Sequence, residues 1–292
     1  MPGAGIIFAA TGQSYNILAR RAALSLRRAM PEIPIDLYTE MPGFHAGRPP
    51  VFDAVHKVET RWFRPKMEAL RRSRFSRTLY LDCDVIVLTD LGDVFEILEH
   101  YDIALCQEAA RMSRPARTPY GPALPNAFSS FNSGVVGLRA GDAAQRLMHE
   151  WETRTRESES RFDQPILRQL MYRSELRMHV LSEDYNFMHP RSLPGRPDNM
   201  SAPRILHLPR LYREKRFLQH PDAAYDVQSV LGYDQARALD RLIRNDVTYP
   251  GYPNMPIWSG PRPRSVERLL AWSPKWLRSR ILARFDPPAF DS

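Results

Sequence analysis

Short apolar runs alternate with stretches of helical spacing along the first third of the chain, and this alternation limits the fold more than any other feature. The apolar run 6–10 is followed by a stretch, 15–30, whose apolar residues recur every three or four positions. Strands that are separated by helices predict a mostly parallel sheet with helices on both faces. Further strands are expected at 34–39, 54–58, 78–81, 85–88, 102–106, 134–138, 176–181 and 204–208, and further helices at 65–75, 91–98, 142–157 and 163–172.

The composition excludes several classes of protein. With 43% hydrophobic and 25% charged residues, disorder along the whole chain is excluded. No stretch approaches the roughly 20 apolar residues of a spanning helix, and the first apolar run lacks the basic residues of a signal peptide. The two cysteines, Cys83 and Cys106, show no metal or disulfide spacing, so a reducing cytoplasm is the simplest compartment.

The positive charge is concentrated near the C-terminal end. Lysine and arginine total 41 against 33 acidic residues, a balance of +8, and residues 262–285 alone hold seven basic residues and one acid. One basic segment on a nearly neutral body favours local attachment over nucleic-acid binding, so no nucleic-acid partner is expected. Leu277, Ile281 and Phe285 form an apolar stripe between arginines, which predicts a basic amphipathic helix over 264–285 for an anionic membrane surface. Packing of that stripe against the body is the alternative.

Proline and glycine divide the chain further. They cluster from residue 249 onward, which predicts a large domain at 1–248, a linker at 249–263 and the basic tail at 264–292. A proline-rich loop at 111–126 is also long for a compact domain, and such loops are usually functional or mobile.

The triplet Asp82-Cys83-Asp84 is the sharpest local feature. The chain has 18 aspartates, so about one Asp-x-Asp is expected by chance, and the context must carry the argument. The triplet ends an apolar strand, and ligands bind at the carboxyl ends of strands in open α/β sheets. Paired carboxylates there suit Mg²⁺ or Mn²⁺ with diphosphate oxygens. A strand-end turn with two solvated aspartates is the alternative.

Four segments together resemble a known family. The segment 80–87, Tyr-Leu-Asp-Cys-Asp-Val-Ile-Val, resembles the Asp-x-Asp segment of GT-A-fold glycosyltransferases, especially glycosyltransferase family 8. Segments 131–136, 163–167 and 205–207 resemble the family's Phe-Asn-Ser/Thr-Gly segment, its Asp-Gln motif and its late histidine, in the same order. The resemblance covers about 6–217 and implies an α/β, Rossmann-like GT-A fold with a mixed, mostly parallel sheet flanked by helices. The C-terminal helix would be an extension of that fold.

The resemblance also implies a reaction. The expected enzyme is a metal-dependent hexosyltransferase that moves a sugar from a nucleotide diphosphate, most simply UDP, to an acceptor hydroxyl with retained anomeric configuration. The expected partners are a nucleotide-sugar donor and a glycan, lipid-linked glycan or protein acceptor, and the expected place is the cytoplasm, at the inner face of the membrane.

Roles for single residues follow from the same resemblance. Asp82, Asp84 and His207 would hold Mn²⁺ or Mg²⁺, and Asp163 and Gln164 would lie at the reacting sugar, with Gln164 near its anomeric carbon. The residues implied at the donor site are Ala10, Thr11, Tyr15, Lys66, Asp82, Cys83, Asn132, Ser133 and Lys215.

Plain structural roles remain open for several of these residues. From the residues alone, Asp163 also suits an N-terminal helix cap, His207 a core position and Lys66 an exposed helix position. Tyr15 suits either stacking on a base or burial in the core. The family's glycine after the histidine is absent here, so either Lys215 or Arg213 would contact the diphosphate.

Two other functions stay open as well. A binding module for a nucleotide sugar or a membrane would keep the fold without turnover. Haloacid-dehalogenase-like phosphotransferases also place Asp-x-Asp after an apolar strand, but after the first strand, whereas two or three strands precede Asp82.

Overall fold

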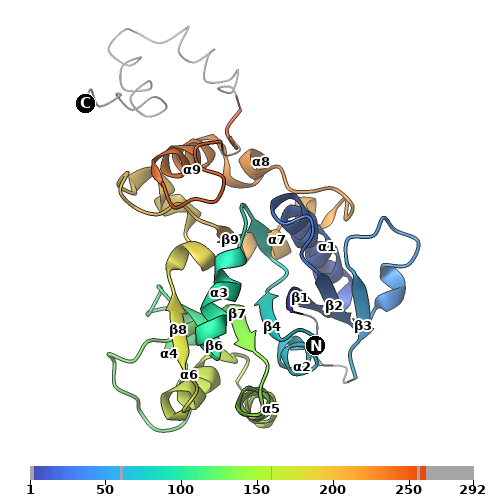
Figure 1. Cartoon of the computed structure of the whole chain (residues 1–292), viewed down its shortest axis with the longest axis vertical. Coiled ribbons are helices and arrows are strands. Elements are labelled where there is room, and N and C mark those ends of the chain that lie inside the picture. The colour runs from blue at the N-terminus through green and yellow to red at the C-terminus, as the bar shows by residue number, and fades with distance from the viewer. Residues whose placement is uncertain (1–2, 60–61, 159, 255–256, 261–292) are drawn as a thin grey trace, which may run out of the picture. The chain divides into compact units, whose positions relative to one another are not determined.

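The computed structural model describes residues 3–59, 62–158, 160–254 and 257–260, and its main feature is a seven-stranded sheet (Figure 1). The strand order is β3-β2-β1-β4-β7-β6-β8, and β5 and β9 form a separate two-stranded sheet. Every strand expected from the sequence is present. The strands are β1 (Ala4–Ala10), β2 (Ile35–Thr39), β3 (Ala54–Lys57), β4 (Arg77–Leu81), β5 (Val85–Val87), β6 (Ile103–Gln107), β7 (Phe131–Arg139), β8 (Met178–Leu181) and β9 (Ile205–His207).

Within the seven-stranded sheet, β7 runs against both of its neighbours and the other pairs are parallel. The chain returns from β6 to β7 through the proline-rich stretch and not through a crossover on the sheet face, so β7 runs back along β6. The expectation of a mixed, mostly parallel α/β sheet is therefore confirmed. The reversal also brings the first residues of β7 to the edge where β4 ends, and Asp82 N donates to Gly134 O at 2.8 Å.

Helices cover both faces of the sheet, as the alternation of strand and helix predicts. One face packs against α2 (Lys66–Arg71), α5 (Asp142–Glu157) and α6 (Gln164–Arg173) in a common apolar cluster. The helices α1 (Gly12–Ala29) and α3 (Gly92–His100) lie over the other face (Figure 1). Neighbouring residues of β7 show the two sides, since Val136 belongs to the apolar cluster and a Cβ on Gly137 would meet Leu98 of α3 at 3.3 Å.

Some boundaries differ from the expectation. Helix α2 ends at Arg71 and not near Phe75, because Phe75 is buried and Arg74 bonds to Asp36 of β2 at 2.8 Å. These contacts require the chain to leave the helix before β4 begins.

The proline-rich stretch contains a short helix, α4 (Arg114–Arg117), that the sequence did not predict. Arg168 of α6 donates hydrogen bonds to the carbonyl oxygens of Pro125 at 2.9 Å and Phe128 at 2.6 Å, at the end of this stretch. The stretch is therefore fastened to α6 at these residues.

The described residues fall into two compact units, and every candidate site residue lies in the first. That unit comprises the described residues within 1–188 and 203–225, and the second comprises those within 189–202 and 226–292. The first unit also holds η1 (Pro42–Phe44), η2 (Glu183–Asn186), α7 (Arg210–Arg213) and η4 (Lys215–Leu218), and the second holds η3 (Pro190–Gly195), α8 (Val227–Leu231) and α9 (Tyr233–Asn245).

The predicted division into 1–248, 249–263 and 264–292 stays a prediction. Within the second unit, Asp240 of α9 accepts hydrogen bonds from Trp258 N at 2.7 Å and Ser259 N at 2.8 Å, so this part of the expected linker is bonded to α9. The basic helix expected at 264–285 lies outside the described residues. No helix in the described ranges has the length and apolar character needed to cross a bilayer.

Candidate active site

Asp82, Asp84 and His207 meet at the carboxyl end of β4. The two aspartates flank the turn between β4 and β5, and β9 pairs with β5 so that His207 lies opposite Val85. This pairing places His207 Nε2 3.3 Å from Asp84 Oδ1 and 4.0 Å from Asp82 Oδ2. Among the described residues, these three form a group of potential metal ligands whose ligand atoms all lie within 4.8 Å of one another. The structure thus assembles the predicted set, although 123 positions separate its last two members.

The three side chains fit a divalent cation of the Mg²⁺ or Mn²⁺ type. Two carboxylates and an imidazole are acceptable ligands for such ions, which fill their other positions with phosphate oxygens and water. Gly134 of β7 makes room for the imidazole, because a Cβ at this position would lie 2.4 Å from His207 Cε1. The glycine of the Phe-Asn-Ser-Gly segment therefore has a steric role that the sequence pattern did not reveal.

The charges of these candidate ligands also affect one another. Burial opposes the charge on Asp84, but His207, a backbone N–H and Lys66 together outweigh burial, so the pKa of Asp84 is lowered from its usual value. Burial likewise opposes the charge on His207, but Asp84 and Asp82 together outweigh burial, so the pKa of His207 is raised. Each group stabilises the charged form of the other in the absence of a cation.

Lys66 joins this cluster from the first residue of α2. Its ammonium lies 3.1 Å from Asp82 Oδ1 and 3.5 Å from Asp163 Oδ2, and it donates to Ser133 Oγ at 3.0 Å. The side chain is buried, which excludes the exposed helix position that the sequence left open. Burial opposes the charge, but Asp163 and Asp82 outweigh it, so the pKa of Lys66 is raised.

Asp163 precedes α6 but does not cap it with its side chain. Its carboxylate accepts hydrogen bonds from Arg64 Nη1 at 2.9 Å and Ser133 Oγ at 3.0 Å. Burial opposes its charge, but Lys66 and Arg64 outweigh burial and lower the pKa of Asp163. The capping role is therefore not found, and the carboxylate is directed toward the lysine.

Tyr80 and Arg64 contact the aspartates of this cluster, and the sequence did not predict either contact. The buried Tyr80 hydroxyl donates to Asp82 Oδ1 at 2.6 Å, and burial and Asp82 raise its pKa well above the usual value. Strand periodicity could have indicated this contact, since residues two apart in an extended segment point to the same side and Asp82 directly follows β4. No comparable signal marks Arg64.

A cavity of about 140 Å³ adjoins this cluster and is lined by most of the residues predicted to bind the nucleotide-sugar donor. Its lining includes Thr11, Tyr15, Lys66, Asp82, Cys83 and Asp84. Tyr15 is 36% exposed, not a core residue, and stacks on Tyr212 with 4.7 Å between ring centroids. Ala10 is buried in β1 and Lys215 is exposed on η4, and neither lines this cavity.

Gln164 and Asn132 lie beside the same cluster but not in that cavity. Gln164 lines a second cavity, of about 300 Å³, with the proline-rich stretch 115–126. Asn132 is buried, and its side chain bonds to protein groups.

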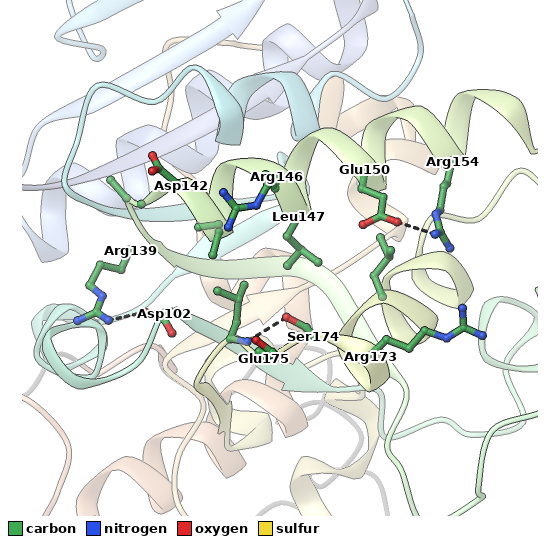
Figure 2. Close-up of a pocket in the computed structure, with 16 residues that line it drawn as sticks. Asp102, Arg139, Asp142, Arg146, Leu147, Glu150, Arg154, Arg173, Ser174 and Glu175 are labelled. Atoms are coloured by element: carbon green, nitrogen blue, oxygen red, sulfur yellow. Dashed lines mark hydrogen bonds and ion pairs between the residues drawn. The ribbon is translucent and has the colours of Figure 1, made fainter.

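A larger cavity of about 660 Å³ lies between α5, α6 and the turn after β7 (Figure 2). It contains none of the predicted site residues. Ion pairs occupy part of its charged lining, namely Arg139 with Asp102 and Arg154 with Glu150 (Figure 2). Its size alone does not indicate a catalytic role.

Comparison with known proteins gives a family match over part of the chain. Residues 71–212 match the family described as nucleotide-diphospho-sugar transferase, which confirms the resemblance found in the sequence motifs. The matched segment contains the Asp-x-Asp triplet, the Asn-Ser-Gly segment, Asp163, Gln164 and His207, but neither Lys66 nor Lys215. No curated protein sequence matches the chain.

Solved glycosyltransferase structures are similar to this chain at low sequence identity. The apo form of GlyE from Streptococcus pneumoniae is 18% identical, covers 82% of this chain and 62% of its own, and has a TM-score of 0.51. A second GlyE structure is 18% identical, with 87% and 66% coverage and a TM-score of 0.50. The galactosyltransferase LgtC with donor and acceptor sugar analogues is 15% identical, with 70% and 87% coverage and a TM-score of 0.48. The chain thus spans about two thirds of GlyE.

Proposed function

This chain is a glycosyltransferase of the GT-A fold, similar to glycosyltransferase family 8, and from that premise we propose that it transfers a sugar from UDP to an acceptor hydroxyl. The acceptor is a glycan, a lipid-linked glycan or a protein, and the anomeric configuration is retained. The observation that carries the proposal is the meeting of Asp82, Asp84 and His207 beside Lys66 at the carboxyl end of β4. Two carboxylates, an imidazole and a buried ammonium suit a site for a cation and a diphosphate.

The proposed chemistry is mainly electrostatic. A Mn²⁺ or Mg²⁺ ion held by Asp82, Asp84 and His207 would neutralise the charge that develops on the diphosphate as the sugar leaves. Lys66 holds Asp82 and Asp163 in place through its ammonium group. Tyr15 offers its ring to the uracil base, and Gln164 offers an amide at the anomeric carbon. Lys215 or Arg213 reaches the diphosphate from the segment after β9.

Release of UDP from a panel of UDP-sugars with Mn²⁺ tests this proposal. Turnover should require the metal and stop when a chelator is added. Asp84→Ala should abolish turnover, whereas Asp142→Ala, which changes an exposed aspartate at the start of α5, should leave it unchanged. Normal turnover by Asp84→Ala would contradict the proposed function.

The two other functions predict different outcomes in the same assay. A binding module without activity would bind UDP with Mn²⁺ but release no nucleotide from any donor. A phosphotransferase would hydrolyse a generic aryl phosphate, but that class places its aspartates after the first strand, whereas Asp82 follows β4. The position of the triplet favours the sugar transferase.

We also propose that the basic segment 264–285 attaches the enzyme to the inner face of the membrane. The support is its sequence alone, with seven basic residues between 262 and 285 beside an apolar stripe. The full chain should sediment with vesicles that contain phosphatidylserine, and a chain lacking 262–292 should not, while both release UDP. Equal sedimentation of the two chains would contradict this attachment.

A further inference from the structure

We propose that Asn132 and Asn186 are positioning residues that orient His207 toward the cation, with Glu108 as their anchor. The inference rests on the proposed function, because it takes His207 as a metal ligand. It assigns to Asn132 a role through His207 in place of a direct contact with the donor. The three residues come from different parts of the chain, at the start of β7, in η2 and after β6.

A continuous series of hydrogen bonds joins these side chains. His207 Nδ1 lies 2.8 Å from Asn186 Oδ1, and Asn186 Nδ2 donates to Asn132 Oδ1 at 3.0 Å. Asn132 Nδ2 in turn donates to Glu108 Oε2 at 3.0 Å. All four residues are buried, so water does not compete readily for these bonds.

The direction of each bond follows from Glu108. A carboxylate only accepts hydrogen bonds, so Asn132 must turn its NH₂ group toward Glu108 and its oxygen toward Asn186. Gly134 N also donates to that oxygen, at 3.0 Å, which supports the same orientation. Asn186 must then donate to Asn132 and turn its own oxygen toward His207.

The consequence for His207 is a defined ring orientation. Because Asn186 presents an oxygen, His207 Nδ1 carries a hydrogen and donates it. The other ring nitrogen, Nε2, then faces Asp84 at 3.3 Å, on the side where the cation would bind. Ligating histidines commonly donate their second N–H to such a partner, which fixes the ring and strengthens the ligand.

Glu108 itself is held by the backbone around the proline-rich stretch. Its Oε1 accepts from Ala110 N at 2.9 Å, and its own N donates to Ser130 O at 2.8 Å. The anchor therefore joins the two ends of the stretch between β6 and β7. Through this anchor, the position of His207 depends on residues that none of the motifs contains.

The experiment measures Mn²⁺ affinity without donor or acceptor, by electron paramagnetic resonance of free Mn²⁺. Asn186→Leu removes the oxygen that faces Nδ1 and should weaken Mn²⁺ binding by about 10- to 100-fold. Asn186→Asp keeps an oxygen at this position and should restore most of the affinity. Glu108→Gln lets the Asn132 amide turn either way and should weaken binding by a smaller factor.

A matched control separates this effect from a general loss of packing. Asn16 of α1 is also buried, and its Oδ1 lies 2.8 Å from His45 Nε2. Asn16→Leu therefore removes a comparable histidine partner outside the metal cluster, and it should leave the Mn²⁺ affinity of the folded protein unchanged.

Each outcome decides between the two claims. Weaker binding by Asn186→Leu with rescue by Asn186→Asp would support the positioning role. Equal affinity of wild type and Asn186→Leu, or equal losses in Asn186→Leu and Asn186→Asp, would overturn this inference and leave the metal-dependent function standing. A wild-type protein that binds no Mn²⁺ would overturn both.

Discussion

The Nζ atom of Lys66 lies 3.1 Å from Asp82 Oδ1, inside a cluster in which the same ammonium also contacts Asp163 and Ser133. A lysine that leads a six-residue helix thus provides the positive charge between a strand-end carboxylate and a second, buried one. The arrangement connects the candidate cation site to the segment that precedes α6, and it accounts for the burial of an otherwise costly pair of charges.

Loss of this lysine should destabilise the protein. In Lys66→Met, Asp163 would remain buried without its ammonium partner, so the free energy of unfolding should fall by about 3 to 5 kcal/mol. Urea unfolding measures the change. Lys57→Met, at an exposed lysine, should shift stability by less than about 0.5 kcal/mol. Equal stabilities of the two variants would contradict the structural role of Lys66.

A side chain at position 134 should not be tolerated. A Cβ in Gly134→Ala would lie 2.4 Å from His207 Cε1, so the imidazole ring would have to shift from its position beside Asp84. We expect weaker Mn²⁺ binding and a loss of about 1 to 3 kcal/mol in unfolding free energy. Gly43→Ala, where a Cβ has open space, serves as the control. Unchanged Mn²⁺ affinity in Gly134→Ala would show that the ring does not depend on this space.

The ring of Tyr15 should contribute to UDP binding. Tyr15 lines the cavity beside Asp82 and is partly exposed, and because one face of its ring stacks on Tyr212, a base would stack on the other face. Tyr15→Leu should weaken UDP binding by about 0.5 to 1.5 kcal/mol, whereas Tyr15→Phe keeps the ring and should bind normally. Calorimetry with UDP and Mn²⁺ measures both. Normal binding by Tyr15→Leu would exclude stacking at this position.

The protein should become less stable as the pH falls, because His45 becomes protonated more readily in the unfolded chain. Burial, with Arg20 and Arg48, lowers the pKa of His45 from 6.5 to about 4 in the folded protein. The unfolded chain therefore binds a proton first, and this contribution to stability, complete above pH 6.5, is lost as the pH falls toward 4. The slope is at most about 1.4 kcal/mol per pH unit.

The variant His45→Gln isolates that contribution. It keeps a donor for Asn16 but does not titrate, so unfolding free energies at pH 7 and pH 5 should differ less than in the wild type. His207, whose pKa is raised, contributes with the opposite sign in both proteins, and the comparison cancels it. An identical pH dependence of the two proteins would contradict the lowered pKa of His45.

Much of the fold and of the metal site could be predicted from local pattern. Every expected strand is present, and strands such as β1, β4 and β7 are contiguous runs of buried residues. Asp82 follows β4 as expected. The predicted end of α2 was wrong, because contacts of Phe75 and Arg74 with distant strands override helix periodicity. Asp163 illustrates the same limit, because a position before a helix predicts a cap and the actual partners come from other segments.

The sequence by itself determined which segments become strands and helices, and it identified carboxylates at a strand end, because these depend on neighbours within a few positions. The family resemblance implied that His207 joins Asp84, and the tertiary structure shows the contact. Only the tertiary structure decided that Lys66 lies between Asp82 and Asp163 and that Asn186 bonds to Asn132. These contacts depend on the reversed direction of β7 and on the pairing of β5 with β9. Such pairings are set by the packing of the whole unit, which no local pattern of residues records.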